Sequence, residues 1–282
     1  DPAGLATVEQ QVVEDHAGHH RLAHRHRADA DAGVVAALRH HLRRGAVDAD
    51  GKTGDGAGIH VQIPVKFFYD QVKRTGHEPR VDELIAVGQV FLPRTDFGAQ
   101  ETCRTIVETE VLRMGYYIYG WRHVPVDVSC LGDKANATRP EIEQILISNA
   151  KGVDEETFER ELYVIRRRIE KAAAAAQVPQ LYICSLSCRS IIYKGMMLAE
   201  QVAEFYPDLM DERYESAFAI YHQRYSTNTF PQWWLAQPFR MLAHNGEINT
   251  LRGNLNWMKS HEIRMASSAF GDMAEDIKPI VA

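Results

Sequence analysis

Cysteine is scarce in this sequence, which argues against a disulfide-stapled fold and against a cysteine-rich zinc site. The four cysteines are Cys103, Cys130, Cys184 and Cys188. Only Cys184 and Cys188 lie close together, and no second pair accompanies them at the spacing of a zinc site. We therefore expect reduced and mostly buried thiols, which is the usual state of free cysteine in a cytosolic protein.

Long apolar runs and a basic surplus are also missing. No stretch approaches the roughly 20 apolar residues of a membrane span, and the N-terminus lacks the apolar core of a secretory signal. The 32 lysines and arginines are outnumbered by 38 acidic residues, so the formal net charge is −6. A nucleic-acid-binding protein normally carries a basic face. We predict a cytoplasmic protein with a small-molecule ligand, and neither nucleic acid nor membrane among its partners.

Aromatic residues are absent from residues 1–33, a segment that differs from the rest of the chain. It is rich in alanine and aspartate, and its five histidines are His16, His19, His20, His24 and His26. One interpretation is a metal-binding histidine cluster. The other is an aberrant or disordered leader, such as a misread frame would produce. No ordered partner ligands or capping signals frame the histidines, which favours the leader and no metal site. Residues 34–282 are then the folded domain.

After residue 34 the sequence predicts a mixture of helices and many strands. Alternating or continuous apolar runs predict strands over residues 59–63, 84–92, 181–186, 190–193, 218–225 and 239–244, and another beginning at residue 116. Helical spacing predicts helices over residues 100–114, 162–169 and 197–205. Several strands are joined too closely for parallel crossovers. We therefore expect an α+β fold of antiparallel sheets with helices packed outside.

Three local patterns add further expectations. Thr138-Arg-Pro-Glu141 matches a capping box, which predicts a helix that buries Ile142, Ile145 and Leu146. The basic run at residues 166–168 is most simply the solvated face of its helix. The glycine-rich run at residues 50–58 lacks the residue order of a phosphate loop, so it predicts tight turns or backbone packed close to a ligand.

The first motif that carries chemistry is Tyr221-His-Gln-Arg-Tyr-Ser-Thr-Asn-Thr229, which follows an apolar strand. The guanidinium of Arg224 can pair in a bidentate way with the carboxylate of a free amino acid. Thr227 and Asn228 can add hydrogen bonds to the same ligand. An interior salt bridge of Arg224 is the alternative interpretation.

The second motif is His244-Asn-Gly-Glu-Ile-Asn249. The side-chain amide of Asn245 beside the backbone N–H of Gly246 offers two convergent donors, which an acyl-transfer enzyme needs to stabilise an oxyanion. A simple β-turn is the other interpretation, because Asn-Gly is a common turn dipeptide. The two motifs in this order, about twenty residues apart, favour one catalytic site.

Together the motifs resemble those of the class II glutamine amidotransferases, a branch of the N-terminal nucleophile hydrolases. Other segments are similar to the glutamate synthases in particular, namely Arg44–Ile59, Gly115–Trp121, Lys134–Glu143, Ser190–Gly195 and Met241–Asn254. The resemblance implies a four-layer αββα sandwich of mainly antiparallel sheets. It also implies that Arg224, Thr227 and Asn228 bind the substrate, and that Asn245 and Gly246 form the oxyanion hole.

The activity implied by this resemblance is hydrolysis of L-glutamine to glutamate and ammonia through a cysteinyl thioester. In the family, synthase domains of the same polypeptide add the ammonia to 2-oxoglutarate. FMN and an iron–sulfur cluster belong to those domains, and no cofactor is expected in this one. A small electron-donating subunit is a further candidate partner.

The sequence departs from the family at both ends. The family's nucleophile is an N-terminal cysteine whose own α-amino group is the base, whereas this sequence starts at Asp1 and has no cysteine before Cys103. The family's Ser-Asp-Ser segment, whose aspartate holds the glutamine α-amino group, is also missing. We therefore expect a truncated domain that shows no turnover as written.

Two alternatives stay open at this point. One is a catalytically dead glutamine-binding or structural module that keeps the pocket without a nucleophile. The other is a class II amidotransferase that acts on a sugar phosphate or a phosphoribosyl compound. The segments Gly115–Trp121 and Lys134–Glu143 argue against the second alternative, because they resemble the longer glutamate synthase version.

Overall fold

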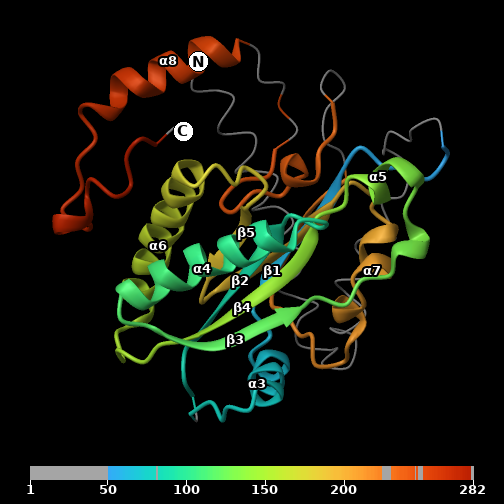
Figure 1. The fold of residues 1–282 in the computed structure, drawn as a ribbon, viewed down its shortest axis with the longest axis horizontal. Helices are drawn as coiled ribbons and strands as arrows, with labels where there is room; N and C mark the ends of the chain where they lie inside the picture. The colour runs from blue at the N-terminus through green and yellow to red at the C-terminus, as the bar shows by residue number, and fades with distance from the viewer. Residues whose placement is uncertain (1–49, 81, 224–229, 245, 247–249, 281–282) are drawn as a thin grey trace, which may run out of the picture.

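Two antiparallel sheets stacked on each other form the centre of the computed structural model, and helices lie outside them (Figure 1). The structure describes residues 50–80, 82–223, 230–244, 246 and 250–280. The strands are β1 (Ala57–Gln62), β2 (Ile85–Leu92), β3 (Tyr117–His123), β4 (Glu141–Ser148), β5 (Tyr182–Ser187), β6 (Ser190–Gly195) and β7 (Ala219–His222). The helices are α3 (Val65–Arg74), α4 (Phe97–Arg113), α5 (Asp133–Ala137), α6 (Glu155–Ala175), α7 (Gln201–Phe205) and α8 (Leu251–Glu262).

The larger sheet has the strand order β3-β4-β2-β5, and all of its pairings are antiparallel. Its centre is the pair β2–β4, in which Val87 lies opposite Leu146. The smaller sheet has the order β6-β1-β7, also antiparallel, with Ile59 of β1 opposite Tyr193 on one side and Tyr221 on the other. The predicted α+β fold with antiparallel sheets is therefore confirmed.

The space between the sheets is filled by one apolar cluster. Ile59 and Tyr193 from the smaller sheet meet Val87, Phe91 and Leu146 from the larger one, and all five are at most 1% exposed. Alternate residues of a strand point to opposite faces, so the remaining side chains of the larger sheet lie on its outer face. Helices α4 and α6 cover this face and form with it a second apolar cluster, which includes Val90, Val107, Ile147, Phe158 and Leu162.

The two long helices begin where the sequence supplies a cap. The side chain of Asp96 accepts a hydrogen bond from the backbone N–H of Ala99 at the start of α4, and Asp154 does the same for Thr157 at the start of α6. Such caps satisfy amides that have no partner inside the helix. Gly115, with φ +80°, follows the end of α4, as the sequence predicted. None of the described helices has the length and apolar character needed to cross a bilayer.

The helix predicted after the capping box is wrong, because residues 141–148 form β4. Ile142 and Leu146 face the cluster between the sheets, whereas Ile145 and Ile147 face the helices. A strand buried on both faces has apolar residues at nearly every position, and their spacing then imitates a helix. Thr138 is instead the C-cap residue of α5, and its hydroxyl donates to the carbonyl of Lys134 within that helix.

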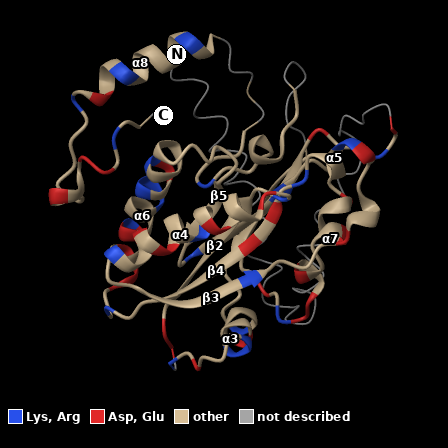
Figure 2. Ribbon diagram, in the orientation of Figure 1, with Lys and Arg blue, Asp and Glu red and all other residues tan. Residues whose placement is uncertain are grey.

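The basic run of α6 is also not a solvated face. Arg166 and Arg167 are 8% and 7% exposed. Arg166 pairs with Glu170 at 2.5 Å, Arg167 donates to the carbonyl of Pro279, and Arg168 pairs with Asp276 at 2.6 Å. Residues 276–279 therefore lie against this part of α6. Figure 2 shows both acidic and basic positions along the helix.

Two further elements differ from expectation in extent. The strand predicted over residues 239–244 is reduced to one isolated bridge between Phe239 and Leu242. The helix predicted over residues 197–205 is limited to α7. α8 lies apart from the sheets in Figure 1, and it has no buried residue.

A polar network crosses the cluster between the sheets. The guanidinium of Arg122 on β3 donates to both carboxylate oxygens of Asp208 and to the side-chain carbonyls of Gln71 and Gln144. The hydroxyl of Tyr193 donates to the same Asp208 at 3.1 Å. The network therefore joins both sheets to the short turn at residues 207–210.

Candidate functional site

The structure brings together the residues that flank the two predicted motifs. Arg224, Thr227, Asn228 and Asn245 lie outside the described residues. Gly246 is described and is exposed; a Cβ added there would come no nearer than 3.5 Å to Nδ1 of His244. The positions that can be followed are therefore the end of β7, just before Arg224, and His244, just before Asn245.

A hydrogen bond joins these two flanks. Nε2 of His222, the last residue of β7, lies 3.0 Å from the backbone carbonyl oxygen of His244. A carbonyl oxygen can only accept, so Nε2 carries the proton in this contact. His222 lies two residues before Arg224, and His244 directly precedes Asn245. The two motifs predicted to share one site therefore start from the same place in the fold.

Gln237 holds the same residue from the other side. Its side-chain Nε2 donates to the carbonyl of His244 at 3.0 Å, and its Oε1 accepts from the backbone N–H of His244 at 2.9 Å. Gln237 is 5% exposed. Both ends of one buried amide are thus committed to one backbone residue. Sequence reasoning missed this residue, because nothing local marks a glutamine as the partner of a position seven residues later.

The glycine-rich run ends next to His222 and Gln237. Gly58 on β1 is paired with His222 on β7. A Cβ at Gly58 would lie 2.7 Å from the carbonyl oxygen of Gln237 and 2.6 Å from Cβ of Lys194, distances that real Cβ contacts do not reach. Only glycine fits this close approach of backbone to backbone. The run, the end of β7 and the segment before Asn245 therefore converge.

The start of the run is a turn and not an anion site. The carboxylate of Asp50 accepts from the backbone amides of Lys52 and Thr53 and from the Thr53 hydroxyl, and these bonds lower its pKa to about 2. Amides that a phosphate loop would offer to a ligand are thus used internally. Gly54 packs directly on the backbone of Met197. The turn at Asp50 agrees with the predicted tight turns, and the close packing found at Gly54 is against the protein's own backbone.

Comparison with known proteins adds the deciding observation. The family model of the class II glutamine amidotransferases matches residues 21–282. The chain belongs to this family. The match begins at residue 21, inside the segment that the sequence assigned to a leader, and the boundary at residue 34 stays a prediction.

This amidotransferase is similar to several glutamate synthases. It is 68% identical over 247 residues to the glutamate synthase (NADPH) large chain of Azospirillum brasilense. This match covers 88% of this chain and 16% of the relative. It is 44% identical over 250 residues, 88% of this chain and 15% of the relative, to the chloroplastic ferredoxin-dependent glutamate synthase of Oryza sativa subsp. japonica. With the Bacillus subtilis (strain 168) glutamate synthase (NADPH) large chain the identity is 42% over 243 residues, 84% of this chain and 16% of the relative. The chain thus spans 15–16% of the length of these curated relatives.

The cysteines of the amidotransferase domain are poor nucleophiles. Burial is the main cause that raises the pKa of the thiols of Cys103 and Cys130 to about 11 and that of Cys184 to about 12. Burial and the nearby Glu159 carboxylate raise the pKa of Cys188 further. The reactive species is the thiolate, so none of the four thiols is activated near neutral pH.

A buried lysine, which the sequence did not single out, lies beside the converging segments. Lys194 on β6 is fully buried, and its Nζ donates to the carbonyl of Trp234 at 2.8 Å and to the hydroxyl of Tyr182 at 3.1 Å. Its ammonium also lies 4.7 Å and 4.8 Å from the ring centroids of Tyr182 and Phe239. Burial lowers its pKa to about 8. Lys194 therefore ties the segment that contains Gln237 to the smaller sheet.

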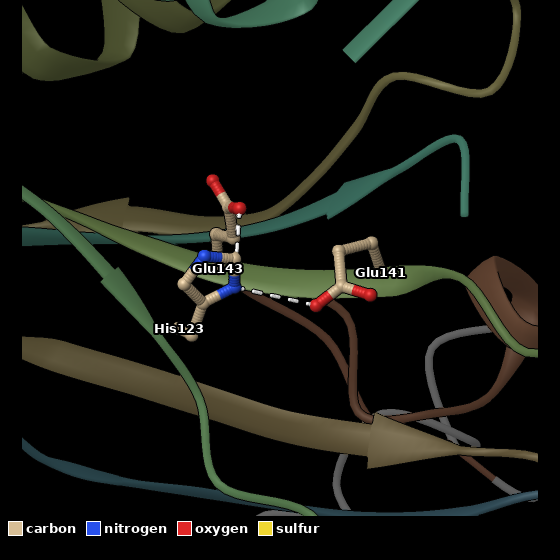
Figure 3. A group of neighbouring side chains, drawn as sticks. All are labelled: His123, Glu141 and Glu143. Atoms are coloured by element: carbon tan, nitrogen blue, oxygen red, sulfur yellow. Dashed lines mark hydrogen bonds and ion pairs between the residues drawn. The ribbon is translucent and has the colours of Figure 1, made fainter. Parts of the chain in front are cut away.

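A second cluster of ionisable groups lies on the larger sheet. Figure 3 shows the ring of His123 directed toward Glu141 and Glu143, with Nδ1 at 3.4 Å and 3.3 Å from their carboxylates. Glu143 is 1% exposed, and it is already paired with Arg104, which donates to both of its oxygens. The guanidinium neutralises the carboxylate that a metal ion would need. This cluster also contains no cysteine, so its residues do not suit an iron–sulfur cluster.

Proposed function

We propose that this chain is the glutamine-hydrolysing domain of a glutamate synthase. The single observation that carries the proposal is the convergence at His244, whose backbone is held by His222 and Gln237. It favours one shared cleft for the motif of Arg224 and the motif of Asn245. Family membership and the similarity to glutamate synthase large chains agree with this role.

In this proposal L-glutamine is the substrate, and glutamate and ammonia are the products. Arg224 binds the α-carboxylate of glutamine, assisted by Thr227 and Asn228. The side chain of Asn245 and the backbone N–H of Gly246 donate to the oxyanion as a thiolate attacks the side-chain amide carbon. The α-amino group of the nucleophile takes the thiol proton and passes it to the amide nitrogen, so that the C–N bond breaks and ammonia leaves. Water then hydrolyses the thioester, which releases glutamate and regenerates the thiol. The nucleophile is an N-terminal cysteine, as in the family.

The rest of the proposed synthase polypeptide uses the ammonia in the cytoplasm. Reductive addition of ammonia to 2-oxoglutarate needs a source of electrons, so FMN, an iron–sulfur cluster and a small electron-donating subunit are assigned to that part. The four cysteines are free and lie in buried or half-buried positions, divided between the two apolar clusters. They offer no set of thiolates for such a cluster in this domain.

The test uses a restored polypeptide, in which Met-Cys-Gly-Val-Gly-Phe and the family's first helix replace residues 1–33 of the full-length protein. We expect it to release ammonia from L-glutamine. Asn245→Ala should lower kcat by about a hundredfold or more, the usual cost of one lost oxyanion donor. Arg224→Ala should mainly raise KM, because a carboxylate contact is made about equally in ground and transition states. An Asn245→Ala variant that keeps its kcat and only melts earlier would show that Asn245-Gly246 is a structural turn.

A catalytically dead glutamine-binding module is the second candidate. It is favoured by the raised pKa values of the buried thiols, none of which is an activated nucleophile. Calorimetry and the ammonia assay on the restored polypeptide distinguish the two. A dead module binds L-glutamine without releasing ammonia even after restoration, and Arg224→Ala abolishes the binding.

A further inference from the structure

Gln237 acts on His244 as a neighbouring strand would. In a hydrogen-bonded pair of an antiparallel sheet, each residue donates its backbone N–H to its partner and accepts the partner's N–H at its own carbonyl. Here the side-chain amide of Gln237 supplies both complementary groups, at 3.0 Å and 2.9 Å. Two simultaneous bonds fix the orientation of the His244 backbone, whereas one bond would leave it free to rotate about the contact.

The segment that carries Gln237, residues 233–237, is itself fixed by its contacts. Trp233 is 1% exposed, and its indole N–H donates to the carbonyl of Ala135 at 3.0 Å. Lys194 holds the carbonyl of Trp234, and the backbone of Gln237 rests on Gly58 of β1. A side chain positions another group well only when its own location is fixed by packing. Gln237 meets this requirement.

A peptide bond joins His244 to Asn245, so the orientation of the His244 backbone constrains the peptide that follows it. We propose that Gln237 is a positioning residue for the oxyanion hole and acts through the backbone of His244. This inference rests on the proposed function, because it assigns Asn245 and Gly246 to the oxyanion. Gln237 acts through His244 and is therefore not a catalytic residue. The hydrogen bond from His222 to the same carbonyl supports the same orientation.

A positioning role and a purely structural role differ in what they do to kinetics. Oxyanion donors act mainly in the transition state, so their misplacement lowers kcat and leaves substrate binding nearly unchanged. Misplacing a catalytic group by about 1 Å costs roughly a hundredfold in rate. A structural role would lower the melting temperature and the active fraction, with no selective fall in kcat per folded molecule.

The first arm compares Gln237→Met with Gln100→Met in the restored full-length polypeptide. Methionine keeps the length of glutamine and removes both hydrogen bonds. Gln100 is a matched control, because it is also 5% exposed and its Nε2 donates to the carbonyls of Pro93 and Arg94, at the start of α4. We expect Gln237→Met to lower kcat about 10- to 100-fold with KM changed less than about twofold. Gln100→Met should leave both constants unchanged per folded molecule.

The second arm uses Gln237→Glu and pH. A protonated carboxyl group can still donate to the carbonyl of His244 and accept from its N–H, whereas a carboxylate cannot donate. The kcat of Gln237→Glu, relative to the unsubstituted polypeptide, should therefore rise as pH falls. The same ratio for Gln237→Met should stay flat. A flat ratio for both variants would overturn the proposal.

The third arm is hydrogen exchange at the His244 amide, which does not depend on turnover. Gln237→Met should accelerate exchange at this amide at least tenfold, with no change at β2 or β4. Polypeptides that hydrolyse glutamine but keep their kcat after Gln237→Met overturn the positioning role alone. If the unsubstituted restored polypeptide shows no hydrolysis, the proposed function and its oxyanion hole fail. Accelerated exchange in Gln237→Met would then show that the contact between Gln237 and His244 is structural.

Discussion

Arg122 and Asp208 form a bidentate ion pair in the interior, although 86 residues separate them in the sequence. The two N–O distances are 2.7 Å and 2.6 Å, and the side chains are 11% and 5% exposed. Arg122 comes from the edge strand of the larger sheet, and Asp208 comes from the turn after α7. The hydroxyl of Tyr193 on the smaller sheet shares the carboxylate. One acidic side chain thus joins three parts of the fold.

Asp208→Ala should lower the free energy of unfolding by about 3 kcal/mol, because it leaves the buried guanidinium of Arg122 without an opposite charge. The figure lies at the low end for such changes, since Gln71 and Gln144 still accept from Arg122. Urea denaturation measures the loss. Glu215→Ala, which breaks the exposed pair with Lys66, is the control and should change little. Equal losses in the two variants would contradict a special role for the buried pair.

Gly54→Ala should destabilise the protein by about 1–3 kcal/mol. Its new methyl group would meet the backbone of Met197 and Leu198, which cannot move aside as a flexible side chain could. Gly98→Ala is the matched control, because Gly98 lies in the first turn of α4 and its Cβ would come no nearer than 3.5 Å to Asp96. That change should be neutral or slightly stabilising. Thermal melts of both variants decide the point, and an unchanged melting temperature for Gly54→Ala would refute the close packing.

Lys194 gives a prediction about pH. Its pKa is about 8 in the folded protein, below its ordinary value of 10.5, because burial disfavours the ammonium. Between pH 8 and 10 the unfolded chain therefore binds more protons at this residue, and its contribution to stability rises with pH. Below pH 8 both states are charged, and the folded state bears the full cost of burial.

Lys194→Met removes this dependence. The stability of the variant relative to the unsubstituted protein should fall by about 2 kcal/mol between pH 7 and pH 9.5. The groups that face Lys194 are the hydroxyl of Tyr182, the thiol of Cys184 and the guanidinium of Arg240. The pKa values of Tyr182 and Cys184 are raised to about 12 in the folded state, and both groups remain in the variant, so their effects largely cancel. Lys66→Met, at an exposed lysine, should show no such trend. Urea melts at both pH values measure the difference.

The sequence predicts those parts of the fold in which local pattern and environment agree. α4 buries one stripe and has a capping aspartate, and β1 alternates between a buried and a partly exposed face. β4 defeats the same reasoning, because Ile145, Leu146 and Ile147 are buried on alternating sides. A strand that is buried on both faces lacks the alternation of apolar and polar residues by which a strand is recognised in a sequence.

The candidate site divides in a similar way. Its chemical motifs are visible in the sequence, because asparagine, glycine and arginine carry their functions in local order. Their support is not visible, since Gln237, Lys194 and Gly58 act on partners in other segments. The arginines of α6 were misjudged for the same reason. Only the folded chain places residues 276–279 against them.

Those arginines give the protein a response to ionic strength. Apolar clusters hold the sheets together, and salt does not weaken them, whereas the contact of Arg168 with Asp276 is partly exposed and is screened within a few ångströms at high salt. Added salt should therefore weaken the contact between α6 and residues 276–279, while the packing of the two apolar clusters is unaffected. The attachment of this stretch to the helix is thus sensitive to ionic strength, and the stacking of the sheets is not.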